Sequence, residues 1–299
     1  MENKEPSSVY HIPILVEEIS NLLAWEKSER IIDLTVGGGG HLLALLSQFP
    51  RPTEIWANDQ DLEAIAESKK KLQAFEPIHW VHGNFRDIRK LTSEKFDRVL
   101  IDLGVSSHQL DDASRGFSFQ KEGPLDMRMD QTRGMPASEW LMQCDITEFA
   151  NIVYEYGEER SSRVFARRWA EARGALKGRD LTTAAFVQAL GFNFNSKNPQ
   201  GRHPLTRVFQ ALRIHLNQEW QALDEVLNLL PDLLSDKGRL SILTFHSLED
   251  RKVKWALRGK LKPINKKVIQ AGETESRANP RSRSAKLRVY EKMQTEELE

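Results

Sequence analysis

A run of four glycines, Gly37–Gly40, is preceded by an acidic residue and followed by a histidine in the segment Asp-Leu-Thr-Val-Gly-Gly-Gly-Gly-His. Glycine has no Cβ, so a ligand can approach the main chain of such a loop closely. Dinucleotide-binding loops need a third small residue, and Leu42 stands at that position. Asp33, four residues before the loop, suits a cationic ligand better than a phosphate. The loop therefore favours S-adenosylmethionine, with its ammonium and sulfonium groups, over a nicotinamide dinucleotide.

Two further carboxylates follow apolar runs later in the chain. Asp59 lies twenty residues after Gly39 and could accept hydrogen bonds from both ribose hydroxyls of a nucleoside, although capping the next helix is an alternative role. Asp102 could face a methyl acceptor or hold the methionine end of the cofactor. Phe85 could pack on an adenine ring, although a core position explains a single phenylalanine more often. No Asp/Asn-Pro-Pro-aromatic motif follows, so generic motifs leave the methyl acceptor open.

These residues need a sheet that brings the ends of the apolar runs together. Short apolar runs predict buried strands, and amphipathic stretches between them predict helices. Strands that alternate with helices indicate a parallel, doubly wound sheet. The expected strands are 30–35, 54–59, 78–82, 96–104, 238–246 and 286–291, and the first helices are 41–48 and 62–75. The predicted fold class is α/β, a Rossmann-like class I methyltransferase with a mostly parallel doubly wound sheet and an inserted all-helical domain.

The insertion is expected where the strand pattern stops. Residues 110–205 show helical patterns near 137–156, 160–173 and 181–190, without a convincing strand. We therefore expect a helical insertion domain at 110–205, a candidate for substrate recognition. The cofactor-binding domain is then made of 1–109 and 206–299. The second part is expected to start with one long helix at 206–230, whose buried stripe is Val208, Leu212, Leu216, Trp220, Leu223, Leu227 and Leu230.

Composition bears on disulfides, metal sites, membrane insertion and nucleic-acid binding. The single cysteine, Cys144, rules out an intramolecular disulfide and offers no metal cluster, so no metal is expected and a reducing cytoplasm is the default. No apolar run approaches the roughly 18 residues of a membrane helix, and Met1–Val9 lacks the pattern of a secretory leader. Although the net charge is zero, residues 251–292 contain fourteen Lys or Arg and three Glu. This segment is either an electrostatic footprint for phosphate or a solvated tail.

Longer motifs resemble those of one family, the bacterial 16S ribosomal RNA cytosine-N4 methyltransferases, also called the small-subunit methyltransferase H or MraW family. The resemblance runs from His11 to the last expected strand, nearly the whole chain. Several long and unusual motifs occur in order, which is unlikely by chance. They are VGGGGH (36–41), DLGVSSHQLD (102–111), RGFSF with GPLDMRMD (115–130), YGEER (156–160), HPLTRVFQALRI (203–214), LTFHSLEDRKVK (243–254) and NPRSRSAKLR (279–288).

The resemblance implies S-adenosylmethionine as cofactor and N4-methylation of a cytosine in the decoding region of 16S rRNA, within the small ribosomal subunit. Gln109 is implied as a cofactor contact by the resemblance alone. Leu34 and Leu42 depart from the smaller residues usual in the family, and the stretch 255–278 is shorter than in many members. The implied cofactor contacts are Gly39, Gly40, His41, Asp59, Phe85, Asp102 and Gln109.

The implied reaction transfers a methyl group to a conjugated amine, which is a poor nucleophile. Asp102 is the candidate acceptor for the amino hydrogens. The target base must leave its stack, and Phe117 and Phe119 could stack on it or instead pack between the domains. Arg115 and Arg128 are candidates for holding phosphates. His246 lies near the cleft and is either a proton acceptor or a hydrogen-bonded strand terminus. Arg281 and Arg283 are candidates for contact with the RNA backbone, and strand alternation would put the arginines of the run Arg281, Arg283, Lys286 and Arg288 on one face.

Two other functions stay open at this point. A nicotinamide-dependent oxidoreductase could use the same sheet, although Leu42 speaks against it. A non-catalytic ribosome-assembly factor could retain the fold without turnover, although Gly39, Asp59 and Asp102 are all present. The sequence leaves the oligomeric state open, with a homodimer as one candidate.

Overall fold

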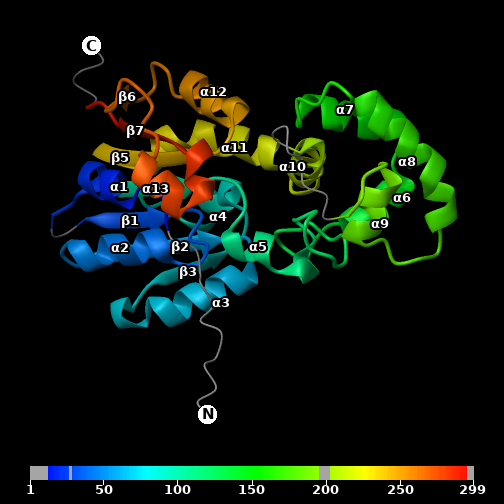
Figure 1. Cartoon of the computed structure of the whole chain (residues 1–299). Helices are drawn as coiled ribbons and strands as arrows, with labels where there is room; N and C mark the ends of the chain where they lie inside the picture. Colours follow the sequence, from blue (N-terminus) through cyan, green and yellow to red (C-terminus); the bar gives the residue numbers. More distant parts are fainter. Residues whose placement is uncertain (1–12, 27–28, 195–202, 295–299) are drawn as a thin grey trace. The chain divides into compact units, whose positions relative to one another are not determined.

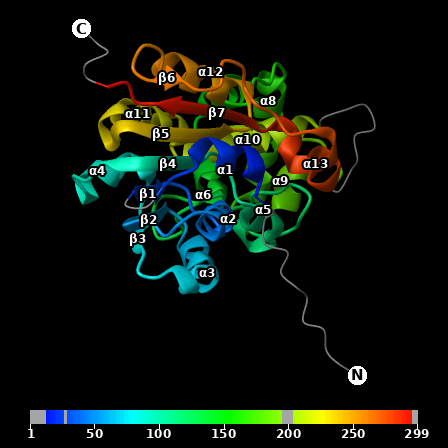
Figure 2. The ribbon, with the colours of Figure 1, turned by 90° about the vertical axis from the view of Figure 1, so that its left-hand side faces the viewer.

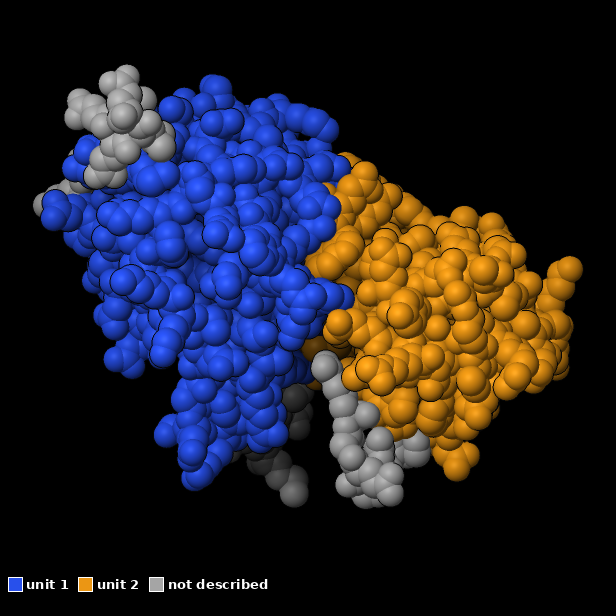
Figure 3. All heavy atoms as spheres, turned by 90° about the horizontal axis from the view of Figure 1, so that it is seen from above, with its two compact units in different colours: residues 1–106, 222–299 blue, residues 107–221 orange. Residues whose placement is uncertain are grey.

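A computed structural model describes residues 13–26, 29–194 and 203–294 (Figure 1). Met1–Val9, where no secretory leader is expected, lies outside the described residues. The chain divides into two compact units, coloured in Figure 3: unit 1 consists of Met1–Ser106 and Ala222–Glu299, and unit 2 of Ser107–Gln221. The sequence analysis expected the two junctions after residues 109 and 205. In the structure they come after residues 106 and 221, so the helix at 204–216 belongs to unit 2.

Unit 1 is built on a seven-stranded sheet of order β3-β2-β1-β4-β5-β7-β6. Figure 2 follows this order from β3 at the bottom to β7 near the top. Strands β3, β2, β1, β4 and β5 are parallel, while β7 pairs antiparallel with β5 and β6. The predicted Rossmann-like, mostly parallel sheet is therefore confirmed. The strands are β1 (Arg30–Asp33), β2 (Glu54–Asp59), β3 (His79–His82), β4 (Phe96–Asp102), β5 (Leu234–Thr244), β6 (Lys262–Pro263) and β7 (Lys286–Glu291).

The strand order reverses direction at β1, because β2 lies on one side of it and β4 on the other. Open α/β sheets bind ligands outside the carboxyl ends of the strands at such a switch point. Asp33 pairs in register with Ala57 of β2 and Leu100 of β4, and β2 and β4 each continue for two more residues. The carboxyl ends of β1, β2 and β4 therefore meet at one edge.

The helices of unit 1 connect and cover these strands. Helix α1 was not expected from the sequence; it begins after Leu15, whose side chain cannot cap a helix. By contrast, Asp61 caps α3 by accepting the Glu63 N–H at 3.0 Å. The helices are α1 (Val16–Leu23), α2 (Gly40–Gln48), α3 (Leu62–Lys71), α4 (Ile88–Leu91), α11 (Glu219–Leu233, shared with unit 2 up to 221), α12 (Ser247–Ala256) and α13 (Glu273–Ala278), with short 3-10 turns η1 (Gln73–Phe75), η2 (Phe85–Asp87) and η4 (Pro280–Ser284).

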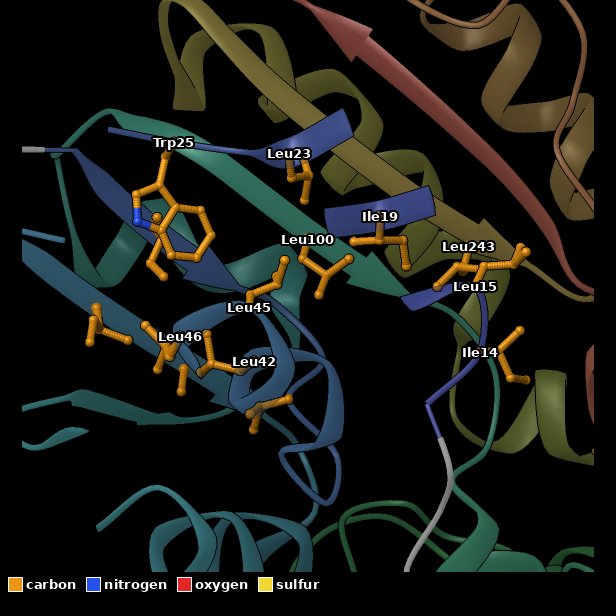
Figure 4. Packing of buried hydrophobic residues seen from close by; sticks show 14 of the residues in the cluster. Ile14, Leu15, Ile19, Leu23, Trp25, Leu42, Leu45, Leu46, Leu100 and Leu243 are labelled. Atoms are coloured by element: carbon orange, nitrogen blue, oxygen red, sulfur yellow. The ribbon is translucent and has the colours of Figure 1, made fainter. Parts of the chain in front are cut away.

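The two family departures in the glycine region are both core residues. Leu42 packs in a buried cluster with α1 and α2 residues such as Leu45 and Ile19 (Figure 4). Leu34 is fully buried, and its N–H donates to the Leu100 carbonyl oxygen at 2.9 Å. Both side chains therefore fill the protein interior. Burial of a leucine is worth about 1.5–3 kcal/mol.

Unit 2 is helical. The pattern at 137–156 predicted one helix, but the structure has two, because the chain leaves the helix at Cys144 and Asp145 starts the next one by accepting the Thr147 and Glu148 N–H groups. Cys144 is a buried free thiol. The helices are α5 (Ser107–Asp111), α6 (Ala137–Gln143), α7 (Ile146–Glu155), α8 (Ser162–Leu176), α9 (Thr183–Ala189) and α10 (Pro204–Leu216), with η3 (Ala113–Arg115).

The long helix predicted at 206–230 is also two helices, α10 and α11. Gln218 has φ 51°, which lies in the left-handed region and ends the helical path. Asn217 instead turns its amide towards another segment of unit 2: Nδ2 donates to the Met127 carbonyl oxygen at 2.8 Å, and Oδ1 accepts the Met129 N–H at 2.7 Å. The predicted stripe is therefore split, and Leu216 and Trp220, which flank the break, are only half-buried.

Two expectations for the last third of the chain need correction. β5 begins at Leu234 rather than 238; Gly238 lies in an irregularity where an added Cβ would be 2.7 Å from the Ser235 carbonyl oxygen. Arg281 and Arg283 lie in η4 and not in a strand, because Asn279 caps the turn and Pro280 starts it, so strand alternation does not align them with β7. In the parts of the chain that are described, no helix is long and apolar enough to cross a membrane.

Candidate cofactor site

The glycine loop crosses the carboxyl end of β1 in a conformation that needs glycine. Gly37 and Gly39 have φ of 51° and 76°, where a Cβ is unfavourable. α3 supports the loop from the side: Ser68 Oγ donates to the Gly37 carbonyl oxygen at 2.6 Å, and Lys71 Nζ donates to that of Gly38 at 3.0 Å. The carbonyl oxygens of two glycines are therefore occupied, which fixes the direction of the peptide groups.

Asp59, at the end of β2, holds the same loop from the other side. Its Oδ2 accepts the Gly37 N–H at 2.8 Å, and its Oδ1 accepts the Asp61 N–H at 2.9 Å. Each carboxylate oxygen can accept a second hydrogen bond, so the side chain is anchored and still able to bind hydroxyl groups. Burial raises the pKa of Asp59 to about 6, against the lowering effect of these amides.

Asp33 and Thr35 link the end of β1 to β4. Asp33 Oδ1 accepts the Thr35 N–H at 3.0 Å, and Thr35 Oγ1 accepts the Asp102 N–H at 2.6 Å. Burial, with a smaller contribution from the nearby Asp102 and Asp59 carboxylates, raises the pKa of Asp33 to about 8. Three carboxyl groups therefore lie close together at the switch point, and the Asp102 and Asp59 carboxylates disfavour ionisation of Asp33.

Asp102 and His41 face each other across this edge. His41 Nδ1 is 3.6 Å from Asp102 Oδ2, and His41 Nε2 is 2.8 Å from the Ile14 carbonyl oxygen. Because a carbonyl oxygen can only accept, Nε2 carries the hydrogen and Nδ1 of the neutral ring is bare. Burial lowers the pKa of His41, so the neutral form is favoured.

The second oxygen of Asp102 is available for a ligand. Oδ1 is buried and has no hydrogen-bond partner among the described residues. Burial, reinforced by the Glu249 carboxylate, raises the pKa of Asp102 to about 7. A buried acceptor with no donor is costly, and a donor or cation supplied by a ligand would remove that cost.

His246 follows the end of β5 and caps α12. Its Nδ1 accepts the Glu249 N–H at 3.4 Å, while its Nε2 lies 2.9 Å from Glu249 Oε1. Glu249 Oε2 in turn accepts the Phe245 and His246 N–H groups, which completes a capping box. The His246 ring therefore has a defined structural role at the helix N-terminus.

Phe85 is half-buried at the start of η2, just after β3. In the sheet, His82 of β3 pairs with Asp59 of β2. Phe85, three residues after His82, therefore comes at the same edge of the sheet as Asp59, the candidate for ribose binding. Asn84 fixes the turn by accepting the Arg86 N–H at 3.2 Å.

Five further predicted residues belong to unit 2: Gln109, Arg115, Phe117, Phe119 and Arg128. Gln109 is buried in α5. Arg115 was expected to hold a phosphate, but it is 1% exposed, and its Nη2 donates to the carbonyl oxygens of Arg128 and Met129 at 3.0 Å each. Its guanidinium therefore ties two loop segments together. Phe117 is also buried, with the Arg115 guanidinium 5.9 Å from its ring.

Phe119 and Arg128 are more accessible than these two. The Phe119 ring stacks on His203 at 5.1 Å and meets Phe209 edge-on at 5.5 Å. Arg128 forms a two-point ion pair with Asp126, with both N–O distances 2.8 Å. This pairing raises the pKa of Arg128 and neutralises much of the charge that a phosphate contact would use.

Sequence reasoning did not identify Thr35, Glu249 or Glu275 as parts of this edge. The spacing His246-x-x-Glu249 is that of a capping box and was available as a signal. Thr35 bonds to Asp102, which lies 67 positions later in the chain, and Glu275 bonds to Leu15, which lies 260 positions earlier. No local pattern indicates such contacts.

Comparison with known proteins places the chain in a family. The family model described as "MraW methylase family" matches residues 8–293. "Ribosomal RNA small subunit methyltransferase H" of Synechococcus elongatus is 42% identical over 296 residues, covering 98% of both chains. Proteins of the same name are 44% identical in a Nostoc species, covering 94% of this chain and 92% of that one, and 39% identical in Alcanivorax borkumensis, covering 97% and 99%.

The matches extend over nearly the full length of this chain and of its relatives, and they include both the glycine loop and the strand-end carboxylates described above. A family model that spans residues 8–293, together with relatives above 39% identity at this coverage, leaves no other assignment. The chain belongs to the MraW methylase family.

Proposed function

We propose that this protein transfers a methyl group from S-adenosylmethionine to the N4 amine of a cytosine in the decoding region of 16S rRNA, within the small ribosomal subunit. The observation that carries the proposal is the edge at β1, β2 and β4, where a glycine loop, Asp59 and the His41–Asp102 pair converge in a chain that the family model matches over residues 8–293. The printed name of the relatives specifies small-subunit ribosomal RNA as their substrate.

The residues at this edge fit the cofactor. The buried, unpartnered Asp102 Oδ1 and the bare His41 Nδ1 are acceptors that suit the ammonium group of a methionine moiety. Asp59 would bind the ribose hydroxyls, Phe85 would cover the adenine, and Gly39 and Gly40 allow close approach of the main chain. When bound, S-adenosylmethionine supplies an electrophilic methyl group on its sulfonium.

The protein's own residues have a limited chemical task. The lone pair of a cytosine N4 amine is conjugated into the ring, so the amine must be oriented and its hydrogens accepted. Orientation alone can lower such a barrier by roughly 7–11 kcal/mol. Asp102 is our candidate for the acceptor, with binding of the methionine end as its alternative role. Gln109 is proposed as a further cofactor contact because of the family resemblance.

The RNA side of the proposal rests on accessible groups. A base must be turned out of its stack to reach a sheet edge, and Phe119 is a candidate for stacking on it. Arg281 and Arg283 in η4 are proposed contacts for the RNA backbone, and Arg283 is exposed.

The cytoplasm, which contains the small ribosomal subunit, is the proposed compartment. A homodimer stays a candidate state that sedimentation of the purified protein would test.

A methyl-transfer assay tests the activity directly. Purified protein with methyl-labelled S-adenosylmethionine should label small ribosomal subunits lacking the modification, and nucleoside mass spectrometry should find N4-methylated cytidine in their 16S rRNA. Naked 16S rRNA in parallel separates the assembled particle from free RNA as substrate. Cells that lack the gene should lose the same nucleoside.

Three outcomes would contradict the proposal. Cofactor binding with no labelling of either substrate would indicate a non-catalytic assembly factor. Saturable binding of NADH, followed by its fluorescence, would indicate the oxidoreductase alternative. Lack of binding to S-adenosylhomocysteine at millimolar concentration would remove the cofactor site itself.

A further inference from the structure

The segment Pro13–Leu15 is packed directly on the glycine loop and α2. An added Cβ at Gly40 would lie 3.3 Å from the Pro13 ring, so this ring lies directly against the Gly40 main chain. Ile14 and Leu15 are buried in the cluster that includes Leu42 and Leu243 (Figure 4). The Ile14 carbonyl oxygen is the partner of His41 Nε2 at 2.8 Å. The position of one peptide group therefore determines which nitrogen of His41 carries the hydrogen.

That peptide group precedes a strained residue. Leu15 has φ 55° and ψ 36°, a left-handed conformation that a leucine rarely adopts. A single side chain from a distant part of the sequence holds it: the Leu15 N–H donates to Glu275 Oε1 at 2.8 Å. The Leu15 N–H and the Ile14 carbonyl group belong to the same planar peptide unit. Fixing the N–H therefore fixes the direction of the carbonyl oxygen as well.

We propose that Glu275 is a positioning residue for the cofactor site, which holds the Ile14–Leu15 peptide so that His41 keeps its hydrogen on Nε2 and presents a bare Nδ1 beside Asp102. The inference rests on the proposed cofactor site and adds to it a residue that touches neither cofactor nor RNA. Without the Glu275 acceptor, the peptide can rotate, and the Ile14 carbonyl oxygen no longer selects the Nε2–H form. Nδ1 then carries the hydrogen in part of the molecules and cannot accept one from a ligand.

The pKa of His41 also depends on the contacts that link Glu275, the Ile14–Leu15 peptide and the His41 ring. Burial is the main effect on His41 and lowers its pKa, while the Ile14 carbonyl oxygen and the Glu275 carboxylate each oppose this shift. Glu275 is therefore close enough to influence the ring electrostatically as well as through the peptide. A role confined to holding α13 would leave the imidazole unaffected.

The first test uses the unmodified protein without cofactor. Nitrogen-15 NMR of the imidazole rings distinguishes the two neutral tautomers. The expected result is that His41 is neutral at pH 7.5 with its hydrogen on Nε2. A neutral His41 with its hydrogen on Nδ1 would overturn the proposal.

Variants then test the dependence on Glu275. Glu275→Ala should give a mixture of His41 tautomers and weaken S-adenosylhomocysteine binding about tenfold, since loss of a hydrogen bond to a charged acceptor is typically of that size. Glu275→Gln keeps an acceptor oxygen and should retain the Nε2–H form with a loss of about twofold or less. The matched control is Glu273→Ala in the same helix, because Glu273 is exposed and pairs only with Arg277 among the described contacts. It should match the unmodified protein in both measurements.

The outcomes separate this inference from the proposed function. Glu275→Ala with an unchanged tautomer and unchanged affinity would overturn the positioning role. If Glu275→Ala does not fold, Glu275→Asp shortens the side chain by one methylene and should give the same tautomer mixture; a wild-type spectrum would overturn the role equally. Failure of the unmodified protein to bind S-adenosylhomocysteine would contradict the proposed function, whereas the tautomer in the cofactor-free protein would still report on Glu275.

Discussion

Asp59 combines two tasks in one side chain, since it anchors the glycine loop through Gly37 and, in our proposal, binds the ribose. Asp59→Ala removes both, so we expect S-adenosylhomocysteine affinity to fall more than tenfold, measured by calorimetry. Asp59→Asn keeps one acceptor oxygen and should lose less. Unchanged affinity in Asp59→Ala would exclude Asp59 from the site.

Asp102 is a residue whose removal should stabilise the protein and impair its function. Its pKa is raised to about 7 by burial and Glu249, so at pH 8 the cofactor-free protein keeps a buried charge whose Oδ1 is unpartnered. In Asp102→Asn the charge is absent, and the main-chain bond to Thr35 is retained. We expect an unchanged or higher Tm at pH 8 and at least tenfold lower turnover.

Two controls keep this prediction specific. The same measurement at pH 6, where Asp102 is largely protonated, should show a smaller difference in Tm between Asp102→Asn and the unmodified protein. Normal turnover of Asp102→Asn at saturating cofactor would show that no carboxylate is required there.

At the scale of elements, the ends of β1, β2 and β4 bring together three buried carboxyls with raised pKa values. Burial raises the pKa of Asp33 to about 8, of Asp102 to about 7 and of Asp59 to about 6. These pKa values exceed those of the unfolded chain, so the native state binds more protons. Their contribution to stability is fully present below the unfolded-state pKa of about 4 and is lost progressively as the pH rises from there to about 8. The Tm of the cofactor-free protein should therefore fall over that window.

Cofactor binding should show the opposite pH dependence. A cationic ligand favours the ionised carboxylates, so S-adenosylmethionine should bind more tightly at pH 8 than at pH 6 and should release protons on binding. Calorimetry in buffers of different ionisation enthalpy measures that release. Asp33→Asn removes the carboxyl with the highest pKa and should flatten the Tm profile at its alkaline end. Affinity that is independent of pH would contradict coupling between these carboxyls and the cofactor.

The start of α12 offers a test of whether His246 acts in the chemistry or only in the fold. His246→Ala removes the cap and should cost about 1 kcal/mol of unfolding free energy. Asparagine is a good N-cap, so His246→Asn should recover most of that stability in denaturant titration. A structural role predicts nearly normal turnover for His246→Asn. A stable His246→Asn with strongly reduced turnover would assign the ring to the reaction instead.

The elements also show which parts of the fold a sequence can predict. The strands that carry Asp33, Asp59 and Asp102 were predicted because buried parallel strands are continuous apolar runs with polar residues at their ends. The break at Asn217 was not, because it depends on contacts with Met127 and Met129, about ninety residues away. An amphipathic pattern continues across such a break without a signal.

Single residues also divide into those with a local sequence signal and those that depend on distant contacts. Arg115 was a candidate for phosphate contact, yet it is buried and donates to two carbonyl groups of the protein. Arg281 and Arg283 were expected to share one face with Lys286 and Arg288 by strand alternation, although Asn279-Pro280 is a local signal for a turn. In the first case the information is distant in the chain, and in the second it was present in the sequence.

At the scale of the whole molecule, a neutral chain can still bind RNA through an uneven distribution of charge. The 43 acidic and 43 basic residues balance overall, but 251–292 has fourteen basic residues and three acidic ones. Several of these cations are already paired within the protein, as Arg288 is with Asp250 and Lys252 with Asp224. Arg283 is exposed, and its Nε donates to the Ser276 carbonyl oxygen at the end of α13. The basic turn η4 is the part of this segment that we propose as a phosphate contact.

Replacing Arg281 and Arg283 together by Ala should weaken binding to 16S rRNA and reduce its salt dependence. Each lost phosphate contact lowers the slope of log K against log salt by roughly 0.7–0.9, so two contacts predict a decrease of about 1.4–1.8 in filter-binding titrations. S-adenosylhomocysteine affinity should be unchanged. Arg277→Ala is the matched control, because Arg277 is an exposed arginine of α13 that pairs with Glu273. Since η4 follows α13 directly, a parallel loss of cofactor affinity in the double variant would mean that the two arginines hold α13 and Glu275 in place rather than bind RNA.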